Sequence, residues 1–322
     1  MAISNSPNRQ FFCALVLAWT LVSPAAAAGI HLLVVTGVEG DQEHGDLFYK
    51  WATTMIDAAQ KRDAVDVTFL AEKPDRDPSR ITARSSRENV QRAITDLAQR
   101  AGPGDTVFIL LIGHGSFDGR ESRFNLPGPD LTATDYAKLL DQFRSQRVIF
   151  VNTSSASGGF LPALSAPGRT VVTATTTGGE RNETRFPSYF VEAFATDRAD
   201  LDKNGRVSVL EAFTYARAKV AEEYKKEGLL PTEHAALEDG SEGHLAGTMF
   251  LAPDLADVGS SSTADPALRA LYEEREALEQ KIARLKQRKT AMDPAQYEQN
   301  LEKLLTELAL KTRAIRELEG RK

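Results

Sequence analysis

The stretch from Asp105 to Phe160 contains two apolar runs, TVFILLI at 106–112 and RVIFV at 147–151. The first run leads into the polar segment GHGS at 113–116, and the second leads into NTSSASGG at 152–159. Runs of this kind are typical of strands that are buried on both faces. If the two strands are parallel neighbours, both polar segments open at the carboxyl edge of one sheet, where ligands of open α/β sheets bind. His114 would then face a set of hydroxyl side chains.

Strand and helix patterns alternate around this stretch. Apolar runs predict further strands at 30–36, 65–70 and 170–175. Apolar residues at helical spacing and N-capping residues predict helices at 48–59, 85–97, from 132 onward, 186–194 and 207–225. Residues 233–244 are predicted to form a polar loop, and 248–251 to form a closing strand. This order predicts an α/β fold with a mostly parallel sheet and helices on both faces.

Residues 1–28 have the form of a secretory signal peptide. They combine a polar start, the apolar run FFCALVLAWTLV and a small-residue region that ends at Ala28. A membrane-anchoring helix is the alternative, but the run is shorter than the roughly 20 residues that span a bilayer. We therefore expect an exported protein, periplasmic or secreted, with no membrane span after cleavage.

Cleavage of the signal would also remove Cys13, which is the only cysteine of the chain. The exported protein would then have neither a disulfide nor a thiolate nucleophile. Its charge is acidic, since the formal net charge of −6 becomes −7 when Arg9 is lost, leaving 38 basic and 45 acidic side chains. An acidic protein is a poor partner for nucleic acid or for anionic membranes.

The two strand ends resemble a known arrangement. A His-Gly pair after a buried strand, with a later strand that ends in Cys-x-Ser-Gly, is the pattern of the caspase and legumain clan of cysteine peptidases, which includes metacaspases. Here the second segment reads Ser155-Ala156-Ser157-Gly158, with serine at the cysteine position. The resemblance covers residues 30–250 and implies a caspase-like α/β/α sandwich. It implies that His114 is the catalytic histidine and that the N–H groups of Gly115 and Ser155 bind the oxyanion.

Serine in place of cysteine changes the chemistry that the site requires. A cysteine thiol has a pKa of about 8.5 and is readily held as a thiolate. A hydroxyl must lose its proton during attack, which needs a base that is normally oriented by a carboxylate. The sequence does not identify that carboxylate, although Asp118 is near. Two outcomes stay open: a working Ser155–His114 pair, or weak or lost peptidase activity, with Ser154 and Ser157 as alternative hydroxyls.

The segment 173–183 would leave its strand at the same edge of the sheet. In the related peptidases this region helps to shape the substrate pocket, so the resemblance makes Glu180, Asn182 and Glu183 candidate substrate contacts. A solvated loop is the alternative for each of them. Motifs of other hydrolases and of phosphate-binding loops are missing, and the five histidines show no zinc-ligand spacing.

Residues 200–211 match the calcium loop of an EF-hand. Oxygen-bearing side chains stand at loop positions 1, 3, 5 and 9, glycine at position 6 and glutamate at position 12. The predicted calcium ligands are Asp200, Asp202, Asn204, the backbone carbonyl of Arg206, Ser208 and Glu211. An acidic loop that only joins two helices is the alternative. In an exported protein we expect this calcium to be structural.

The C-terminal part of the chain has a different pattern. Residues 253–264 are small and mostly uncharged, which predicts a linker between the caspase-like domain at 29–252 and a helical unit at 265–322. Asp265-Pro266 and Asp293-Pro294 each place an N-cap residue before a proline at the first helical position. Leucines and isoleucines at heptad spacing predict an antiparallel helical hairpin. It could self-associate or bind a protein partner through 265–320.

Two functional hypotheses follow from these patterns. The first is an exported caspase/legumain-like domain that cleaves peptides or binds them without cutting. The second is a calcium-stiffened scaffold without enzyme activity, in which the helical hairpin mediates protein interaction.

Overall fold

The structure is a computed structural model that describes residues 29–61, 65–204, 206–241, 243–251, 266–287 and 292–319. The predicted signal peptide at 1–28 and the predicted linker at 253–264 lie outside the described residues. Within the described part of the chain, no helix combines the length and the apolar character needed to cross a membrane.

A seven-stranded sheet forms the centre of the fold, in the order β10-β9-β8-β4-β1-β2-β3. All neighbouring pairs are parallel except β10 and β9, which are antiparallel. The strands are β1 (Ile30–Thr36), β2 (Val65–Ala71), β3 (Ala83–Arg84), β4 (Thr106–Ile112), β8 (Arg147–Asn152), β9 (Arg169–Thr173) and β10 (Ala236–Glu238). The two strands from which the sequence argument started, β4 and β8, are hydrogen-bonded neighbours in the middle of this sheet.

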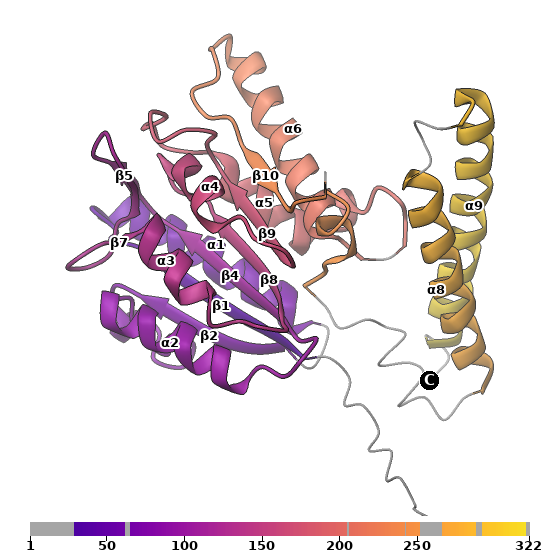
Figure 1. Cartoon of the computed structure of the whole chain (residues 1–322), viewed down its shortest axis with the longest axis horizontal. Coiled ribbons are helices and arrows are strands. Elements are labelled where there is room, and N and C mark those ends of the chain that lie inside the picture. Colours follow the sequence, from indigo (N-terminus) through magenta and orange to yellow (C-terminus); the bar gives the residue numbers. More distant parts are fainter. Residues whose placement is uncertain are drawn as a thin grey trace, which may run out of the picture.

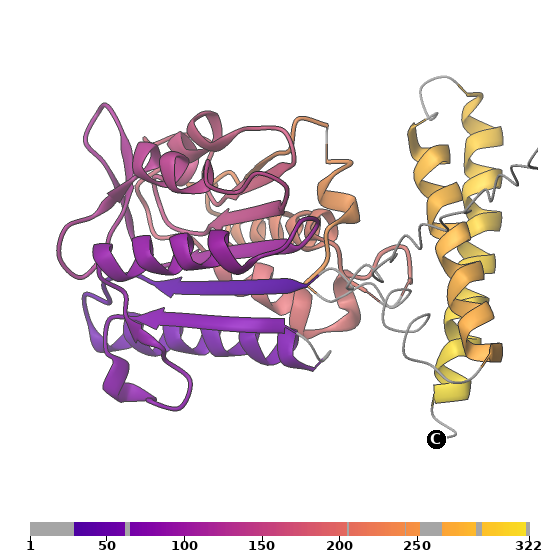
Figure 2. The same ribbon diagram turned by 60° about the horizontal axis from the view of Figure 1, so that its bottom comes forward.

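Helices cover both faces of the sheet (Figure 1). The helices of this domain are α1 (Gln42–Gln60), α2 (Arg87–Arg100), α3 (Ala133–Leu140), α4 (Phe160–Leu164), α5 (Phe186–Ala195) and α6 (Val209–Glu227). One buried apolar cluster joins α1, α5 and α6 to the sheet, and a second cluster joins α2, α3 and α4 to it. Figure 2 shows α1 and α2 on opposite sides of the sheet. The predicted α/β fold is confirmed.

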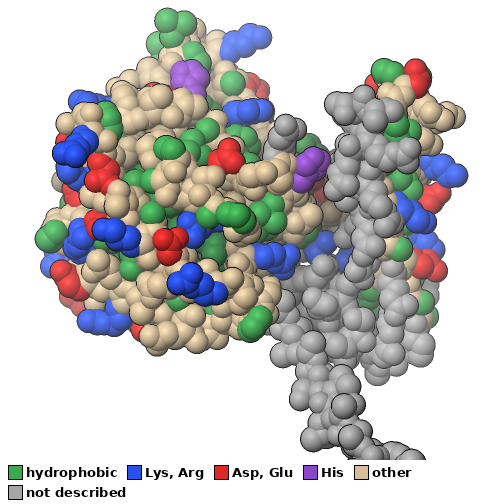
Figure 3. All heavy atoms as spheres, viewed as in Figure 1, with side chains coloured by type: hydrophobic (Ala, Val, Ile, Leu, Met, Phe, Trp, Pro, Cys, Tyr) green, Lys and Arg blue, Asp and Glu red, His purple; other side chains and the backbone are tan. Residues whose placement is uncertain are grey.

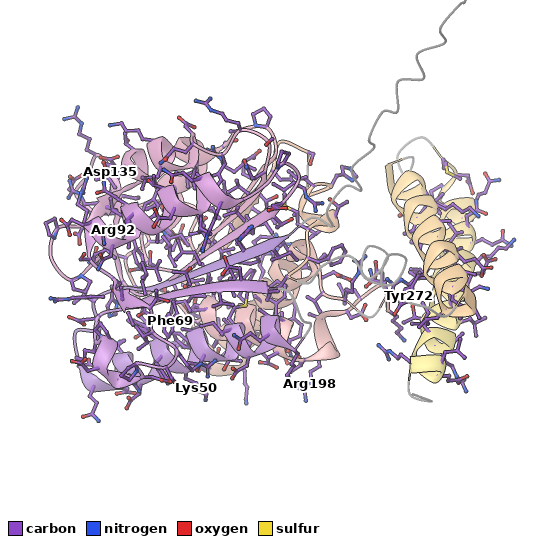
Figure 4. The ribbon with its side chains drawn as sticks, turned by 90° about the horizontal axis from the view of Figure 1, so that it is seen from below. Lys50, Phe69, Arg92, Asp135, Arg198 and Tyr272 are labelled. Atoms are coloured by element: carbon purple, nitrogen blue, oxygen red, sulfur yellow. The ribbon has the colours of Figure 1, made fainter. Side chains whose placement is uncertain are left out.

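Side chains show the same layering in Figure 4, where Lys50 of α1 lies on one side of the sheet and Arg92 of α2 on the other. Phe69 of β2 is fully buried between the sheet and α1. On the opposite face, Phe150 of β8 stacks on Phe160 at 5.9 Å between ring centroids. Truncation of such a buried aromatic ring costs about 3–5 kcal/mol, so these layers hold the strand ends in place.

Side-chain caps fix where the helices begin. The Thr132 hydroxyl accepts from the Asp135 N–H at 3.1 Å and the Asp135 carboxylate accepts from the Thr132 N–H at 3.1 Å, which completes a capping box at α3. At α2 the Ser86 hydroxyl accepts one bond, from the Asn89 N–H at 3.3 Å. Asp41 caps α1 through the His44 N–H, so α1 begins within the segment that leaves β1. Each such cap stabilises a helix by about 1 kcal/mol.

The closing strand predicted at 248–251 is wrong. The edge strand is β10, which lies in the predicted polar loop and pairs with β9 from Ala236 to Glu238. Residues 246–248 form a 3₁₀ turn, and Phe250 makes one isolated bridge to Ser208 of the predicted calcium loop. Met249 and Leu251 are buried against the core, so their apolar character serves packing rather than sheet pairing.

The long loop after His114 contains a second, three-stranded sheet. Its strands are β5 (Gly115–Phe117), β6 (Ser122–Phe124) and β7 (Leu131–Thr132), all antiparallel. The Asn125 N–H donates to the His114 carbonyl at 3.0 Å, so this sheet braces the histidine turn. Each of these strands is only two or three residues long, so the sequence pattern of the segment indicates a loop.

The C-terminal unit consists of α8 (Pro266–Gln287) and α9 (Pro294–Glu319). Leu268 and Tyr272 of α8 pack against Ile315 of α9, and Leu278 and Ile282 pack against Leu308. Early residues of one helix therefore meet late residues of the other, which confirms the antiparallel hairpin. Figure 4 shows Tyr272 on α8.

Candidate functional site

The turn after β4 and the turn after β8 touch each other. A Cβ atom on Gly115 would lie 2.2 Å from the Ser155 carbonyl oxygen and 2.5 Å from Ser154 Oγ. A Cβ on Gly158 would lie 2.2 Å from the backbone of Thr176 and Thr177. Only glycine allows these backbones to approach so closely. The glycines of the two motifs therefore bring the histidine and the serine segments together at one edge of the sheet.

Ser155 is presented by a tightly held turn. The next residue, Ala156, is fully buried and has a left-handed backbone with φ of 53°, a conformation that is uncommon for a residue with a side chain. Its N–H donates to the Glu180 carbonyl at 2.7 Å. Asn152 Oδ1 accepts from the Ser154 N–H at 3.0 Å and from the Ser154 hydroxyl at 2.7 Å. Ser154 is thus engaged in holding the turn.

The Ser155 hydroxyl is bound to the backbone of Gly115. It donates to the Gly115 carbonyl at 3.1 Å, and the Gly115 N–H lies 3.4 Å from Ser155 Oγ. Within the described chain, no hydrogen bond joins this hydroxyl to the His114 ring. The predicted residues are therefore brought together, but the hydroxyl is turned toward the predicted oxyanion donor rather than toward the base.

The third predicted serine, Ser157, faces away from the histidine turn. Its hydroxyl lies 3.2 Å from Thr175 Oγ1, and Thr175 Oγ1 also accepts from the Gly158 N–H at 2.9 Å. Both hydroxyls are fully buried. Ser157 therefore fastens the serine turn to Thr175, just after β9, and Ser155 is the serine that lines the same hollow as His114.

His114 sits against two rings of α1. Its ring centroid is 5.2 Å from that of Phe48 and 4.8 Å from that of His44, both in edge-to-face geometry. Burial lowers the pKa of His114, and the positive charge that His44 carries when protonated lowers it further. A hydrogen bond to the Glu39 backbone acts in the opposite direction. A lowered pKa favours the neutral imidazole, which is the form that can accept a proton from serine.

His44 belongs to the site as well, although no sequence motif singles it out. Its Nδ1 atom lies 2.8 Å from Asp41 Oδ2, and its Nε2 atom lies 3.4 Å from Glu183 Oε1. The hydrogen bond to Asp41 raises the pKa of His44 against the opposing effect of burial, and the charge of Glu183 raises it further. The signal was present in the sequence, because His44 follows the carboxyl end of β1 and that strand is the neighbour of β4.

No carboxylate in the described chain hydrogen-bonds to His114. Asp118, which is near in sequence, pairs with Arg123 at 2.5 Å and accepts from the N–H groups of its own turn. The Glu39 carboxylate is buried and pairs with Lys73 at 2.6 Å. The orienting groups around His114 are therefore a backbone carbonyl and a second histidine.

The predicted substrate residues lie in different environments. The Glu180 carboxylate binds Thr176, Thr177 and the backbone and ring of His234, so it holds its own loop together. Asn182 is exposed. Glu183 is exposed too, and it lines a small hollow together with His114, Ser155 and Trp51.

That hollow has a volume of ≈ 10 Å³, about the room of one water molecule. Trp51, Glu183 and Thr184 also line a much larger pocket of ≈ 600 Å³. Asn182 belongs to this larger pocket. The small hollow beside the serine and the larger pocket are therefore neighbours that share part of their walls.

The predicted calcium loop lies between α5 and α6. Carboxylate oxygens of Asp200, Asp202 and Glu211 lie within 4.8 Å of one another. The Asn204 N–H donates to Asp200 Oδ1 at 3.0 Å. Burial raises the pKa of Glu211, and the nearby charge of Asp202 adds to this effect. Three converging carboxylates, one of them buried, suit a hard divalent cation.

The other predicted ligands support the loop. The Arg206 N–H donates to Asn204 Oδ1 at 2.8 Å, and the Arg206 guanidinium lies 3.9 Å from the centre of the Phe250 ring. The Ser208 hydroxyl donates to Glu211 Oε2 at 2.8 Å and caps α6 in a capping box with that glutamate. The loop is therefore closed by its own side chains, fixed to the start of α6 and packed on Phe250.

No protein-family model and no curated protein matches this chain. Several solved structures are similar to it. Protein GSU0716 from Geobacter sulfurreducens is 15% identical, with 70% of this chain and 99% of that chain covered and a TM-score of 0.46. The Drosophila initiator caspase Dronc is 11% identical, with 78% and 98% covered and a TM-score of 0.41. Caspase-1 from Spodoptera frugiperda is 10% identical, with 66% and 86% covered and a TM-score of 0.39.

Two of these three structures are caspases. The structures similar to this chain thus include members of the family that the sequence resembles. At these identities the similarity is one of fold and says nothing of chemistry.

Proposed function

We propose that this chain is an exported homologue of the caspase and legumain peptidases that binds peptides at the carboxyl edge of its sheet. Ser155 and His114 take the place of the cysteine and histidine of that clan. The observation that carries the proposal is the meeting of the Ser155 hydroxyl, the Gly115 N–H and the half-buried His114 ring beside one hollow. Two neighbouring strands in the middle of the sheet, β4 and β8, deliver these groups.

We propose that its peptidase activity is weak or absent. The Ser155 hydroxyl donates to the Gly115 carbonyl, so it must turn before its proton can pass to His114. His114 is suited to the neutral state, but no carboxylate among the described residues hydrogen-bonds to its ring to hold it during proton transfer. Removing that carboxylate from a serine triad lowers turnover about 10⁴-fold. Peptide binding needs neither step.

The test is a peptide-library screen with wild type, Ser155→Ala, Ser155→Cys and His114→Ala. We expect wild type to bind peptides with little or no cleavage, and Ser155→Cys to cleave, because a thiol ionises far more readily than a hydroxyl. His114→Ala in the Ser155→Cys background should abolish that cleavage. If wild type neither binds nor cleaves any peptide and Ser155→Cys restores nothing, the proposal fails.

We propose in addition that the loop 200–211 binds one Ca²⁺ ion. Side-chain oxygens of Asp200, Asp202, Asn204, Ser208 and Glu211 and the backbone carbonyl of Arg206 would hold it. The convergence of three carboxylates around a buried Glu211 supports this assignment, since the ion would offset their mutual repulsion. The expected role is structural stiffening of the connection between α5 and α6. Isothermal titration of the whole protein with CaCl₂ tests it, and the absence of both binding heat and thermal stabilisation at millimolar calcium counts against it.

A calcium-stiffened scaffold is the second candidate function. The observation that favours it is the hairpin of α8 and α9, which forms its own apolar seam and leaves Leu310 61% exposed. In this case the interaction surface is the hairpin. Sedimentation of wild type and Leu310→Glu tests self-association through the hairpin. Self-association of wild type that is lost in Leu310→Glu supports the scaffold function only if the peptide screen is negative.

A further inference from the structure

The larger pocket beside the serine site is built by three helices and one loop. Its walls come from α1, from the segment 182–185, from the start of α5 and from the end of α6 with the residues that follow it. Its lining includes Trp51, Glu183, Arg185, Tyr189, Leu229 and Leu230. At ≈ 600 Å³ it has the size of a ligand site rather than of a packing defect.

The apolar part of this lining is unusually exposed. Leu229 and Leu230, here called the rim, are 53% and 87% exposed, and the rings of Trp51, Tyr189 and Tyr224 in the same lining are less exposed. Burying a leucine side chain that now faces water stabilises a complex by about 1.5–3 kcal/mol before ordering costs. A ligand with a bulky apolar side chain would cover this rim.

The walls are fixed before any ligand binds. The Glu233 carboxylate accepts from the N–H groups of Arg185 and Phe186 at 2.8 and 3.1 Å, and so holds the start of α5. The Tyr189 hydroxyl donates to Glu223 of α6 at 2.8 Å. These bonds tie α5 to α6 and to the segment after it, so a ligand need not order the pocket.

The charged residues that line the pocket indicate which ligand group would bind beside the apolar side chain. The Arg185 guanidinium is 2.7 Å from Glu227 and 3.4 Å from Glu223, so its charge is already paired. Glu183 is 61% exposed and lines both the pocket and the hollow at Ser155. Glu183 also lies 3.4 Å from His44 Nε2, so its charge is paired when that ring is protonated. Its exposed carboxylate still attracts a basic ligand group at this junction and repels an acidic one.

We propose that this pocket receives a bulky apolar side chain of a peptide that lies across Ser155, with a basic residue next to it at Glu183. The assignment rests on the proposed peptide-binding function and names the class of peptide that this site selects. Since Trp51, Glu183 and Thr184 line both spaces, one extended peptide can place a side chain in the pocket and pass the mouth of the small hollow at Ser155.

The test is fluorescence anisotropy with fluorescein-labelled octapeptide pools and the full-length protein. In the first pools one central position is fixed as Leu or Phe, or as Asp, and in the second pools its neighbour is fixed as Arg or as Glu. The variants are Leu230→Asp for the rim, Glu183→Lys for the junction and Gly115→Val for the serine site. Leu310→Asp is the matched control, since Leu310 is an exposed leucine on the hairpin.

We expect wild type to prefer the Leu and Phe pools and to prefer the Arg neighbour. Leu230→Asp should weaken binding of the Leu and Phe pools about tenfold, corresponding to about 1.4 kcal/mol, while Leu310→Asp should not. Glu183→Lys should reverse the neighbour preference.

One result would overturn the pocket assignment and leave the proposed function standing. In that result, peptides bind wild type and lose binding in Gly115→Val, but binding shows no preference for Leu or Phe and is unchanged in Leu230→Asp. If Leu310→Asp weakens peptide binding as much as Leu230→Asp does, the pocket assignment is likewise overturned and the proposed function stands. If no pool binds wild type, the proposed function and the pocket assignment fail together.

Discussion

The serine site and the calcium loop were both predicted from short motifs, yet they depend on the fold in different ways. The loop 200–211 is one continuous segment, and its carboxylates converge as the spacing predicts. The serine site joins two segments from separate strands, and there the structure places the hydroxyl against Gly115 instead of His114. A contiguous motif carries its own geometry, whereas a site assembled across a sheet depends on contacts that neither motif contains.

The largest expected effect tests the assembled site through the close contact at Gly115. Gly115→Ala places a Cβ atom 2.2 Å from the Ser155 carbonyl, so the two turns must separate. We expect a loss of about 1–3 kcal/mol in the free energy of unfolding and loss of peptide binding. Chemical denaturation and anisotropy measure the two effects.

Gly179→Ala is the matched control, because its Cβ would meet Thr177 Oγ1 at an ordinary 3.5 Å. If Gly115→Ala is as stable as Gly179→Ala and binds peptides equally well, the close approach of the two turns has been wrongly assigned as the basis of the site.

The second effect tests the contiguous site. Asp200→Asn and Glu211→Gln each remove one carboxylate charge from the loop, and we expect either change to weaken calcium binding more than about tenfold. Wild type should gain about 2.7 kcal/mol of stability when calcium is present at 100 times its Kd. Titration calorimetry and thermal unfolding check this, with Asp118→Asn as a control because Asp118 lies in another loop. Equal calcium affinity of all four proteins would contradict the ligand assignment.

A third, smaller effect concerns pH. Burial raises the pKa of Glu211 above its ordinary value of 4.5. The folded state therefore binds more protons at this position than the unfolded state, so the contribution of this group to stability falls as pH rises from 4.5 through the folded pKa.

Without calcium, we expect wild type to lose more stability than Glu211→Gln over this pH range. Denaturation curves of both proteins across the range provide the measurement. With calcium the difference should reverse, because the ion needs the ionised carboxylate. Parallel pH profiles of the two proteins in the absence of calcium would show that Glu211 does not cause the loss of stability as pH rises.

The smallest effect concerns His44. The charge of protonated His44 lowers the pKa of His114, so His44→Gln should raise the pKa of His114. NMR titration of the histidine ring protons measures this change. His234→Gln is the control, since the His234 ring pairs with Glu180 instead. An unchanged or lower pKa of His114 in His44→Gln would remove His44 from the electrostatics of the site.

Distant surface charges have little electrostatic effect on the serine site or on the calcium loop. Figure 3 shows basic and acidic side chains interspersed over the face that it presents. Exposed charges farther apart than about 10 Å are largely screened at ordinary salt. The chemistry of both sites therefore depends on the immediate neighbours of each group.

Much of the fold could be predicted because it follows from local patterns. The fully apolar run of β4, the capping box at Thr132 and the heptad seam of the hairpin each determine their element within a few residues. The short strand β10 was missed because three residues carry too little periodicity, and its pairing with β9 depends on residues more than 60 positions away. Met249 gave a false strand signal because core packing and sheet pairing both select apolar residues.

The sequence by itself determined the parallel strands, the meeting of the histidine and serine turns at one edge, and the oxygen spacing of the calcium loop. These follow from hydrophobic periodicity, from glycines at tight turns and from ligand spacing along one segment. Only the tertiary structure decided that Ser155 binds the Gly115 backbone, that His44 and the Glu39 backbone surround His114, and that α1, α5 and α6 enclose a pocket. The physical reason is that side-chain orientation, burial and charge proximity arise from contacts between segments distant in the chain, which no local pattern records.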